Sequence, residues 1–423
     1  MYQDESTKQY PGHGDEDLPE GVHRSREDRP EGQHYFYWKN EILIARDDLP
    51  LIADKLKVDE RVKPDPPPTP MGDPRLGVVF VEATSDEDVP ALVEHLRQPI
   101  EIGHSVQIPR VQPHLVLFPH YHGPYDPLGP AVPAAPIGNL PRRRFFPLPG
   151  HGVKVAVVDT GVWREHRPWF DGRTEGRVPQ DEDVLDLDGD GMLNRADGHG
   201  TFIASVILKH APGARVTAFR ARATDPELTK VGMVLDVDLA TAILDVAGTE
   251  IDIINVSAGG PTHEGGGLPC TIAAIESLLA TKPTVAVVAS AGNAGVPVPF
   301  FPAAMKGVIS VGAVETKGGK DVRASYSNFG TTVDAAAPGT DVHATYVDFP
   351  PAFKGWAKWS GTSFSAPTVA AAVATRRSPG GWRQYLWFLR PKSARQAAYQ
   401  LISDPSLPRV AGIGTIVRPK TYC

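Results

Sequence analysis

From residue 153 onward, short apolar runs alternate with stretches that have helical spacing. The runs lie at 153–158, 216–219, 251–256, 285–289 and 308–311, and the helical stretches lie near 200–209, 235–246 and 270–280. Strands that are apolar along their whole length are typical of parallel sheets, whose faces are both covered by the intervening helices. We therefore predict an α/β fold with a mostly parallel sheet and helices on both faces.

A smaller unit precedes this domain. Apolar strands are expected at 41–45, 77–82 and 114–118, with helices at 47–56 and 85–96 between them. This order predicts a small α+β module over residues 35–118. We expect the polar segment 1–34 to be disordered, the Pro- and Gly-rich segment 119–150 to be a linker, and residues 151–423 to form the main domain.

The composition argues against several classes of protein. The chain has 423 residues and a net charge of -7, without the basic surplus of a nucleic-acid-binding protein. It contains no run of 18 apolar residues that could span a membrane. The N-terminus has no basic region followed by an apolar stretch, so we expect no signal peptide and a cytoplasmic location. Two cysteines, Cys270 and Cys423, are too few for a disulfide framework and are expected to be free thiols.

Three polar residues lie beside glycine at the edges of predicted elements, namely Asp159, His199 and Ser363. A serine hydroxyl becomes a useful nucleophile when a histidine accepts its proton and a carboxylate orients that histidine. A helix that begins at Ser363 would also direct backbone N–H groups toward developing negative charge. Taken singly, each residue has an ordinary alternative: a strand-end turn, a cap or core histidine, and a helix cap.

The segments around these residues resemble the signature motifs of the subtilisin-like serine proteases. The stretches are VVDTGV at 157–162, GHGT at 198–201 and GTSFSAP at 361–367, in the order Asp, His, Ser of that family. Two more stretches match between them, INVSAG at 254–259 and ASAGN at 289–293. Five motifs in the right order make the resemblance specific, and it covers about residues 150 to 415.

The resemblance implies a subtilisin-like α/β domain and a serine endopeptidase that acts through an acyl-enzyme. Ser363 would be the nucleophile, His199 the general base and acid, and Asp159 the orienting carboxylate, with Asn293 donating to the oxyanion. Peptide or protein substrates would bind along Ser257, Ala258, Gly259, Ser290, Ala291 and Gly292. No cofactor is required for this chemistry. Alternatives are a catalytically silent binding domain with the same fold and an α/β-hydrolase esterase, although the esterase's G-x-S-x-G motif is missing.

The sequence departs from the common pattern of the family close to the proposed triad. Phe202 stands where the family often has a second histidine, and Ser205 where it often has glycine. Phe364 and Ser365 replace the common Met-Ala pair. All four are neighbours of the triad rather than members of it, so we expect them to alter packing or the substrate cleft.

An acidic loop precedes His199. Its oxygen-bearing residues are Asp186, Asp188, Asp190, Asn194 and Asp197. Acidic residues at positions 1, 3, 5 and 12 with glycine at position 6 match the spacing of a calcium loop, so a structural calcium ion is one hypothesis. The alternatives are an acidic surface loop, and direct support of the catalytic loop by Asp197.

The N-terminal module resembles the propeptide of the family in its position and element order. Such a module would be an intramolecular inhibitor, and self-cleavage between residues 118 and 150 would release activity. The alternative is a permanent targeting or partner-binding module.

Overall fold

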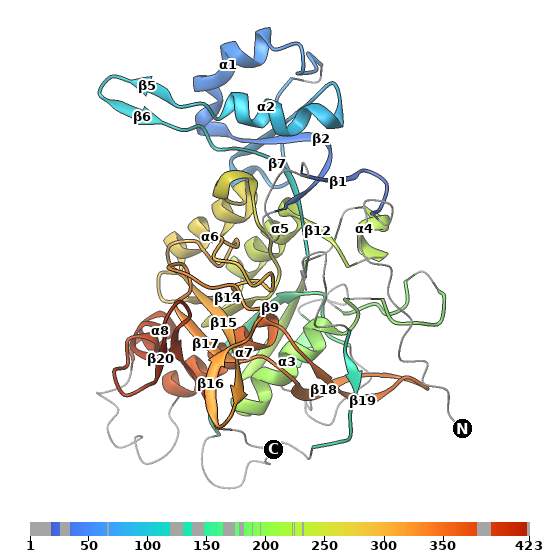
Figure 1. Ribbon diagram of the computed structural model, residues 1–423, viewed down its shortest axis with the longest axis vertical. Coiled ribbons are helices and arrows are strands. Elements are labelled where there is room, and N and C mark those ends of the chain that lie inside the picture. The colour runs from blue at the N-terminus through green and yellow to red at the C-terminus, as the bar shows by residue number, and fades with distance from the viewer. Residues whose placement is uncertain are drawn as a thin grey trace.

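The computed structural model describes residues 18–25, 34–65, 67–118, 130–137, 148–163, 174–176, 182–187, 189–194, 196–221, 223, 225–230, 232–378 and 391–420. These residues form an N-terminal module, which is blue in Figure 1, and a larger α/β domain below it. Within these ranges, no helix combines the length and the apolar character that crossing a membrane requires. Cys270 is buried and free, and Cys423 lies outside the described residues.

A sheet of ten strands, counted over the described residues, forms the centre of the larger domain in the order β10-β11-β9-β13-β14-β15-β17-β21-β20, with β16 beside β15. Neighbouring strands from β10 to β21 are parallel, whereas β16 and β20 pair antiparallel. The strands are β9 (Lys154–Asp159), β10 (Thr174–Gly176), β11 (Arg215–Arg220), β13 (Ile253–Val256), β14 (Ala286–Ser290), β15 (Val308–Lys317), β16 (Lys320–Arg323), β17 (Ala335–Pro338), β20 (Arg409–Val410) and β21 (Gly414–Ile416). The predicted mostly parallel sheet is confirmed.

Helices cover both faces of this sheet, because successive side chains of a strand point to opposite sides. Val155 and Val157 of β9 join a hydrophobic cluster with α3, α7 and α8. Ala156 and Val158 join a second cluster with α5 and α6. The helices are α3 (His199–His210), α4 (Pro226–Lys230), α5 (Asp236–Ala247), α6 (Pro269–Thr281), α7 (Thr362–Arg377) and α8 (Ala394–Ile402).

Part of the predicted linker 119–150 belongs to the larger domain. Strand β8 (Val132–Pro133) pairs with β19 (Phe353–Trp359), which pairs in turn with β18 (Val342–Phe349). Because β8 is an edge strand, Pro133 is tolerated there despite its missing N–H group. Two residues of the predicted Pro- and Gly-rich linker are therefore paired in a sheet.

The N-terminal module is an antiparallel sheet carrying two helices. Its strands are β1 (Val22–Arg24), β2 (Phe36–Ala45), β3 (Thr69–Pro70), β4 (Val78–Glu82) and β7 (Val111–Leu117), its helices are α1 (Leu49–Val58) and α2 (Val89–Leu96), and a hairpin is formed by β5 (Ile100–Ile102) and β6 (Ser105–Gln107). β1 lies in the segment 1–34 that was expected to be disordered, and it is ordered by pairing with β2. That expectation is wrong for residues 22–24.

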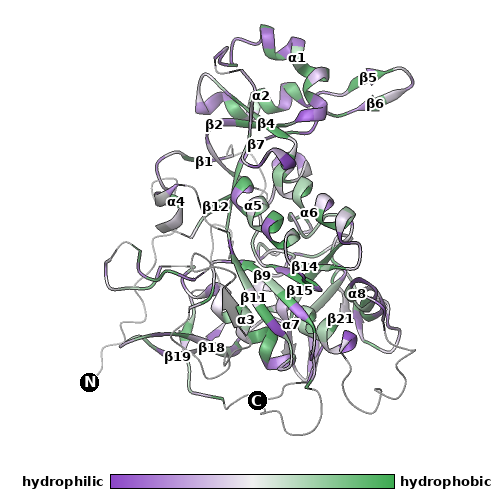
Figure 2. Ribbon diagram, turned by 180° about the vertical axis from the view of Figure 1, so that it is seen from behind, coloured by the Kyte–Doolittle hydropathy of each residue, from purple (hydrophilic) through white to green (hydrophobic). Residues whose placement is uncertain are grey.

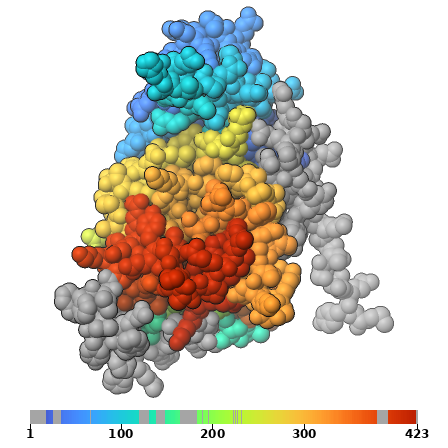
Figure 3. Space-filling model, turned by 60° about the vertical axis from the view of Figure 1, so that its left-hand side comes forward, coloured from blue at the N-terminus to red at the C-terminus, as the bar shows by residue number. Residues whose placement is uncertain are grey.

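The module packs against α5 and α6. One hydrophobic cluster runs without interruption from Ile42 and Leu115 of the module to Leu239 of α5 and Ile275 of α6. Figure 2 shows the apolar parts of these two helices between the central sheet and the module, and Figure 3 shows the contact in space-filling form. The larger domain also contributes β12 (Val234–Leu235), which pairs antiparallel with β7 as the last strand of the module's sheet. The two regions therefore share both a core and a sheet.

Candidate active site

The structure brings Asp159 and His199 together at the carboxyl end of the parallel strands. Asp159 is the last residue of β9 and His199 is the first residue of α3. Nδ1 of His199 lies 2.7 Å from Oδ1 of Asp159, and neither side chain is exposed to solvent. The backbone N–H of Thr160 donates to the same Oδ1 at 2.8 Å, which fixes the rotation of the carboxylate.

Two glycines allow α3 to begin where it does. Gly198 has a φ of 72°, in the left-handed region, immediately before the helix. A Cβ atom on Gly200 would lie 2.2 Å from the carbonyl oxygen of Gly161, so no side chain fits at this position. The start of the helix therefore packs directly on the turn that follows Asp159.

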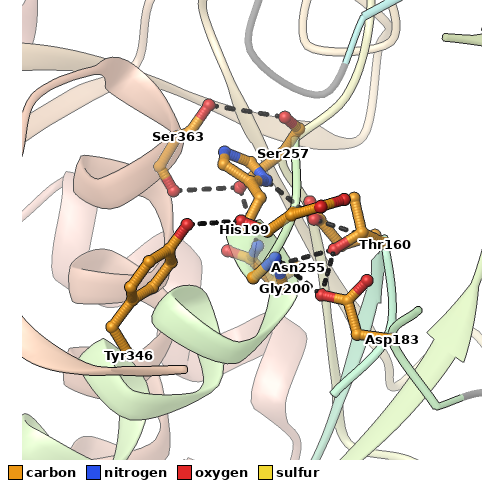
Figure 4. A network of polar contacts seen from close by, with 11 residues as sticks. Thr160, Asp183, His199, Gly200, Asn255, Ser257, Tyr346 and Ser363 are labelled. Atoms are coloured by element: carbon orange, nitrogen blue, oxygen red, sulfur yellow. Dashed lines mark hydrogen bonds and ion pairs between the residues drawn. The ribbon is translucent and has the colours of Figure 1, made fainter. Parts of the chain in front are cut away.

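Ser363 lies in the first turn of α7, beside Ser257. The Ser363 hydroxyl donates to the Ser257 carbonyl at 3.4 Å, and the Ser257 hydroxyl donates to the Ser363 carbonyl at 3.1 Å. In the view of Figure 4, the imidazole of His199 lies between Ser363 and Thr160. Nδ2 of Asn255 donates to the Ser257 hydroxyl at 2.9 Å, which orients this hydroxyl toward Ser363.

Aromatic rings surround the imidazole of His199. Trp359 meets it edge-on with centroids 5.4 Å apart, and Phe364 lies at the same distance. Phe202 packs on Phe364 at 4.8 Å. Phe202 and Phe364 are two of the departures from the common family pattern, and here they belong to one buried aromatic cluster that confines the imidazole.

Asn293 follows β14 and is oriented by Thr362. Its Oδ1 accepts hydrogen bonds from the backbone N–H and the hydroxyl of Thr362, both at 2.8 Å. Because the carbonyl oxygen takes both bonds, the NH₂ group of the side chain is kept as a donor directed elsewhere. Asn293 and Ser363 therefore lie close together, joined through Thr362.

Asp183 is a residue that sequence reasoning missed. Its Oδ2 accepts from the Thr160 hydroxyl at 3.1 Å and from the Gly198 N–H at 2.8 Å. The Thr160 hydroxyl also accepts from the N–H of Gly200 at 3.0 Å. Burial raises the pKa of Asp183 well above its usual range, and the charge of Asp197 raises it further. This carboxyl group links the residues that flank Asp159 and His199.

The six residues expected to bind substrate lie in two segments, 257–259 and 290–292, which we call the substrate segments. Ser257, Ala258, Ser290 and Ala291 are buried. At Gly259, the end of the N-terminal module pairs with the first segment: the Phe118 N–H donates to the Gly259 carbonyl and the Gly259 N–H donates to the Phe118 carbonyl, both at 3.3 Å. The residues just before Phe118, at the end of β7, pair with β12. An extended chain from the module therefore lies along the first substrate segment.

The acidic loop is held by backbone hydrogen bonds. Asp186 accepts from the Gly191 N–H and Asp190 from the Met192 N–H. Oδ2 of Asp197 accepts from the N–H groups of Asp186 and Asn194, both at 2.8 Å, and its carbonyl accepts from the Tyr346 hydroxyl. These bonds favour support of the loop before His199 as the role of Asp197. Asp188 lies outside the described residues. Among the described residues, no group of three Asp, Glu, His or Cys side chains is placed to hold a metal ion. Calcium binding therefore stays a prediction, and no catalytic step is assigned to a metal.

Known proteins share the sequence pattern of the larger domain. The family model described as "Subtilase family" matches residues 150–414. The chain is 36% identical over 240 residues to a thermophilic serine proteinase from Bacillus sp. (strain AK1), covering 54% of this chain and 53% of that protein. It is 30% identical over 270 residues to thermitase from Thermoactinomyces vulgaris, covering 63% of this chain and 85% of thermitase. The alignment thus spans about half the length of the first relative.

A structural likeness extends over both regions of the molecule. Fervidolysin from Fervidobacterium pennivorans, a keratinolytic enzyme related to subtilisin, aligns with 90% of this chain and 60% of its own, with a TM-score of 0.56 and 20% sequence identity. At that identity the likeness speaks for the fold alone. The family match over residues 150–414, with the alignment to most of thermitase, assigns the chain to the subtilase family of subtilisin-like serine endopeptidases.

Proposed function

We propose that this protein hydrolyses peptide bonds with Ser363 as nucleophile, His199 as general base and acid, and Asp159 as the orienting carboxylate. The observation that carries the proposal is the fully buried 2.7 Å contact between His199 Nδ1 and Asp159 Oδ1, next to a serine in the first turn of α7. A carboxylate on Nδ1 holds the proton there, so that Nε2 is the basic nitrogen.

The reaction follows from this arrangement. The Ser363 hydroxyl oxygen bonds to the substrate carbonyl carbon while its proton passes to His199 Nε2. His199 then returns that proton to the departing amine as the C–N bond breaks, leaving an acyl-enzyme. A water molecule then attacks the acyl carbon while its proton passes to His199 Nε2. His199 gives that proton to the Ser363 oxygen as the ester bond breaks, which releases the acid product and restores the Ser363 hydroxyl. Apart from substrate and water, every group involved belongs to the chain, so the proposed chemistry requires no cofactor.

Asn293 is proposed to stabilise the negative charge that develops on the carbonyl oxygen. Its Oδ1 is committed to Thr362, which leaves the amide NH₂ to donate. The backbone N–H of Ser363 is the second proposed donor, because N–H groups in the first turn of a helix lack partners within the helix.

We further propose that the N-terminal module is an intramolecular inhibitor and that the protein is made as a zymogen. The pairing of Phe118 with Gly259 supports this, because an extended chain there would compete with substrate for the first substrate segment. Self-cleavage between residues 118 and 150 is the expected release step, and most of that segment lies outside the described residues.

The test is covalent labelling of the full chain with a fluorophosphonate probe, before and after incubation that permits self-cleavage. We expect wild type to be labelled and Ser363→Ala not to be. Ser365→Ala is the matched control, since the Ser365 hydroxyl is buried two residues away and donates to the Ala337 carbonyl. Labelling that rises with the appearance of a new N-terminus supports the zymogen. No labelling of wild type before or after this incubation would show a catalytically silent domain. Labelling that does not increase after the incubation would favour a permanent module.

A further inference from the structure

A phenylalanine ring lies between the two substrate segments. A Cβ atom on Gly259 would lie 2.8 Å from Cε1 of Phe300, and a Cβ atom on Gly292 would lie 2.7 Å from Cδ2 of the same ring. Opposite edges of one ring therefore touch the backbone of both segments. Phe300 is only 6% exposed, so its side chain fills this space instead of covering it from outside.

The backbone around Phe300 holds the ring in place. The next residue, Phe301, exchanges two hydrogen bonds of 3.0 Å with Gly260, and the Phe300 carbonyl accepts from the N–H of Ala304 at 2.9 Å. Gly260 directly follows the first substrate segment. The strap that carries Phe300 is thus tied to that segment, and moving its backbone away would require breaking the pairing at Gly260.

The register of the first substrate segment indicates which substrate side chain meets the ring. A chain that pairs antiparallel at Gly259, as Phe118 does, brings its residue two positions later opposite Ser257. The Ser257 carbonyl lies 3.4 Å from the Ser363 hydroxyl, so that residue contributes the carbonyl under attack. Asn293, which follows the second substrate segment, must reach the same carbonyl. We call the substrate residue whose carbonyl is attacked the acyl residue. Its side chain therefore enters the space between the two substrate segments.

We propose that Phe300 closes this space and restricts the enzyme to peptide bonds that follow glycine, alanine or serine. A larger acyl residue would have to displace a ring that already contacts both walls, and inserting bulk into a packed site is costly. The inference rests on the proposed function of Ser363, and it names the class of peptide that the same site accepts.

The experiment measures how fast two peptidyl diphenyl phosphonates label the protein after the full chain has been incubated to permit self-cleavage. The two probes differ only in the side chain next to phosphorus, which is methyl or benzyl. We expect the methyl probe to label Ser363 at least about tenfold faster than the benzyl probe. In Phe300→Gly we expect the benzyl rate to rise at least about tenfold while the methyl rate changes less. Phe301→Ala is the matched control, because the Phe301 ring lies beside Gly267, outside the substrate segments, and we expect it to keep the wild-type ratio.

The wild-type comparison decides the matter even if Phe300→Gly folds poorly. Equal rates, or a faster benzyl probe, overturn the inference, as does an unreactive methyl probe on protein that a small fluorophosphonate labels. An unchanged ratio in a folded Phe300→Gly variant also overturns it. Failure of the small fluorophosphonate itself would instead overturn the proposed function.

Discussion

The molecule has two buried polar networks. One joins the N-terminal module to the larger domain, and the other joins residues within the larger domain. The docking network connects the module to the larger domain: the Tyr35 hydroxyl meets His263 Nδ1 at 3.0 Å, and the Gln112 side chain bonds both the N–H and the carbonyl of His263. The active-site network links Asp159, Thr160, Asp183 and His199 within the larger domain. Both networks are shielded from water, and a hydrogen bond that is left unmade inside the protein is costly.

This difference predicts that the proposed catalysis and the proposed inhibition by the module can be changed separately. The docking network lies on the α5 and α6 side, where Tyr35 belongs to the hydrophobic cluster shared with the module. The aromatic cluster that confines His199 belongs to the opposite face, around α3 and α7. A change in the active-site network should lower turnover and leave docking intact, whereas a change in the docking network should free the substrate segments and leave turnover intact.

The largest expected effect is that of Asn293→Leu. Removing the proposed side-chain donor should lower kcat by about 10²- to 10³-fold, the size known for this kind of donor in the related protease subtilisin rather than one derived from this structure. KM should change little, because the bond forms only as charge develops. Steady-state kinetics on a peptide substrate measures both values. A kcat within threefold of wild type would exclude Asn293 from the oxyanion site.

Asp183→Ala should have the next largest effect. The variant loses the bonds to Thr160 and Gly198 that brace Asp159 and His199, so we expect kcat to fall by about 10- to 100-fold at nearly constant KM. Asp183→Asn should restore most of the rate, because both bonds go to one oxygen, which an amide can replace. Equal losses in the two variants would contradict a positioning role and indicate that charge matters instead.

Gln112→Ala tests the docking network. Losing both bonds to buried main-chain groups of His263 should weaken docking by about 2 kcal/mol, or about 30-fold. Fluorophosphonate labelling of the unprocessed chain should rise, and the His263 amide should exchange its hydrogen faster, while kcat of the processed enzyme stays the same. Gln98→Ala, on the exposed surface of the same module, is the control. A lower kcat in Gln112→Ala would break the separation between the two networks.

The two networks also differ in how far the sequence could predict them. The proposed catalytic residues Asp159, His199, Asn293 and Ser363 each lie in a short motif, so adjacent residues point to them. Asp183 carries no such signal, since its partners Thr160 and Gly198 come from other segments and its neighbours form an acidic run.

The remaining features depend on contacts between distant parts of the chain. Gln112 and His263 are 151 residues apart, and nothing local to either suggests the pair. The long apolar strands of the α/β domain were predictable from their own residues. β1 and β8 were not, because each is too short to show a periodic pattern and is ordered by pairing with another strand.

The smallest expected effect lies outside both networks, at the end of α3. Burial lowers the pKa of His210 from 6.5 to about 4, although its Nδ1 lies 3.1 Å from the Lys420 carbonyl. The unfolded chain therefore binds more protons than the folded protein between pH 4 and 6.5, so the free energy of unfolding falls as the pH is lowered through this window. Since His210 is partly exposed, we expect a loss of only about 1 kcal/mol.

Denaturant titrations at pH 4 and 7 should show a smaller loss in His210→Gln than in wild type. An identical loss in both proteins would contradict this origin. Because His210 contacts neither network, docking and kcat at pH 7 should be the same in the variant as in wild type.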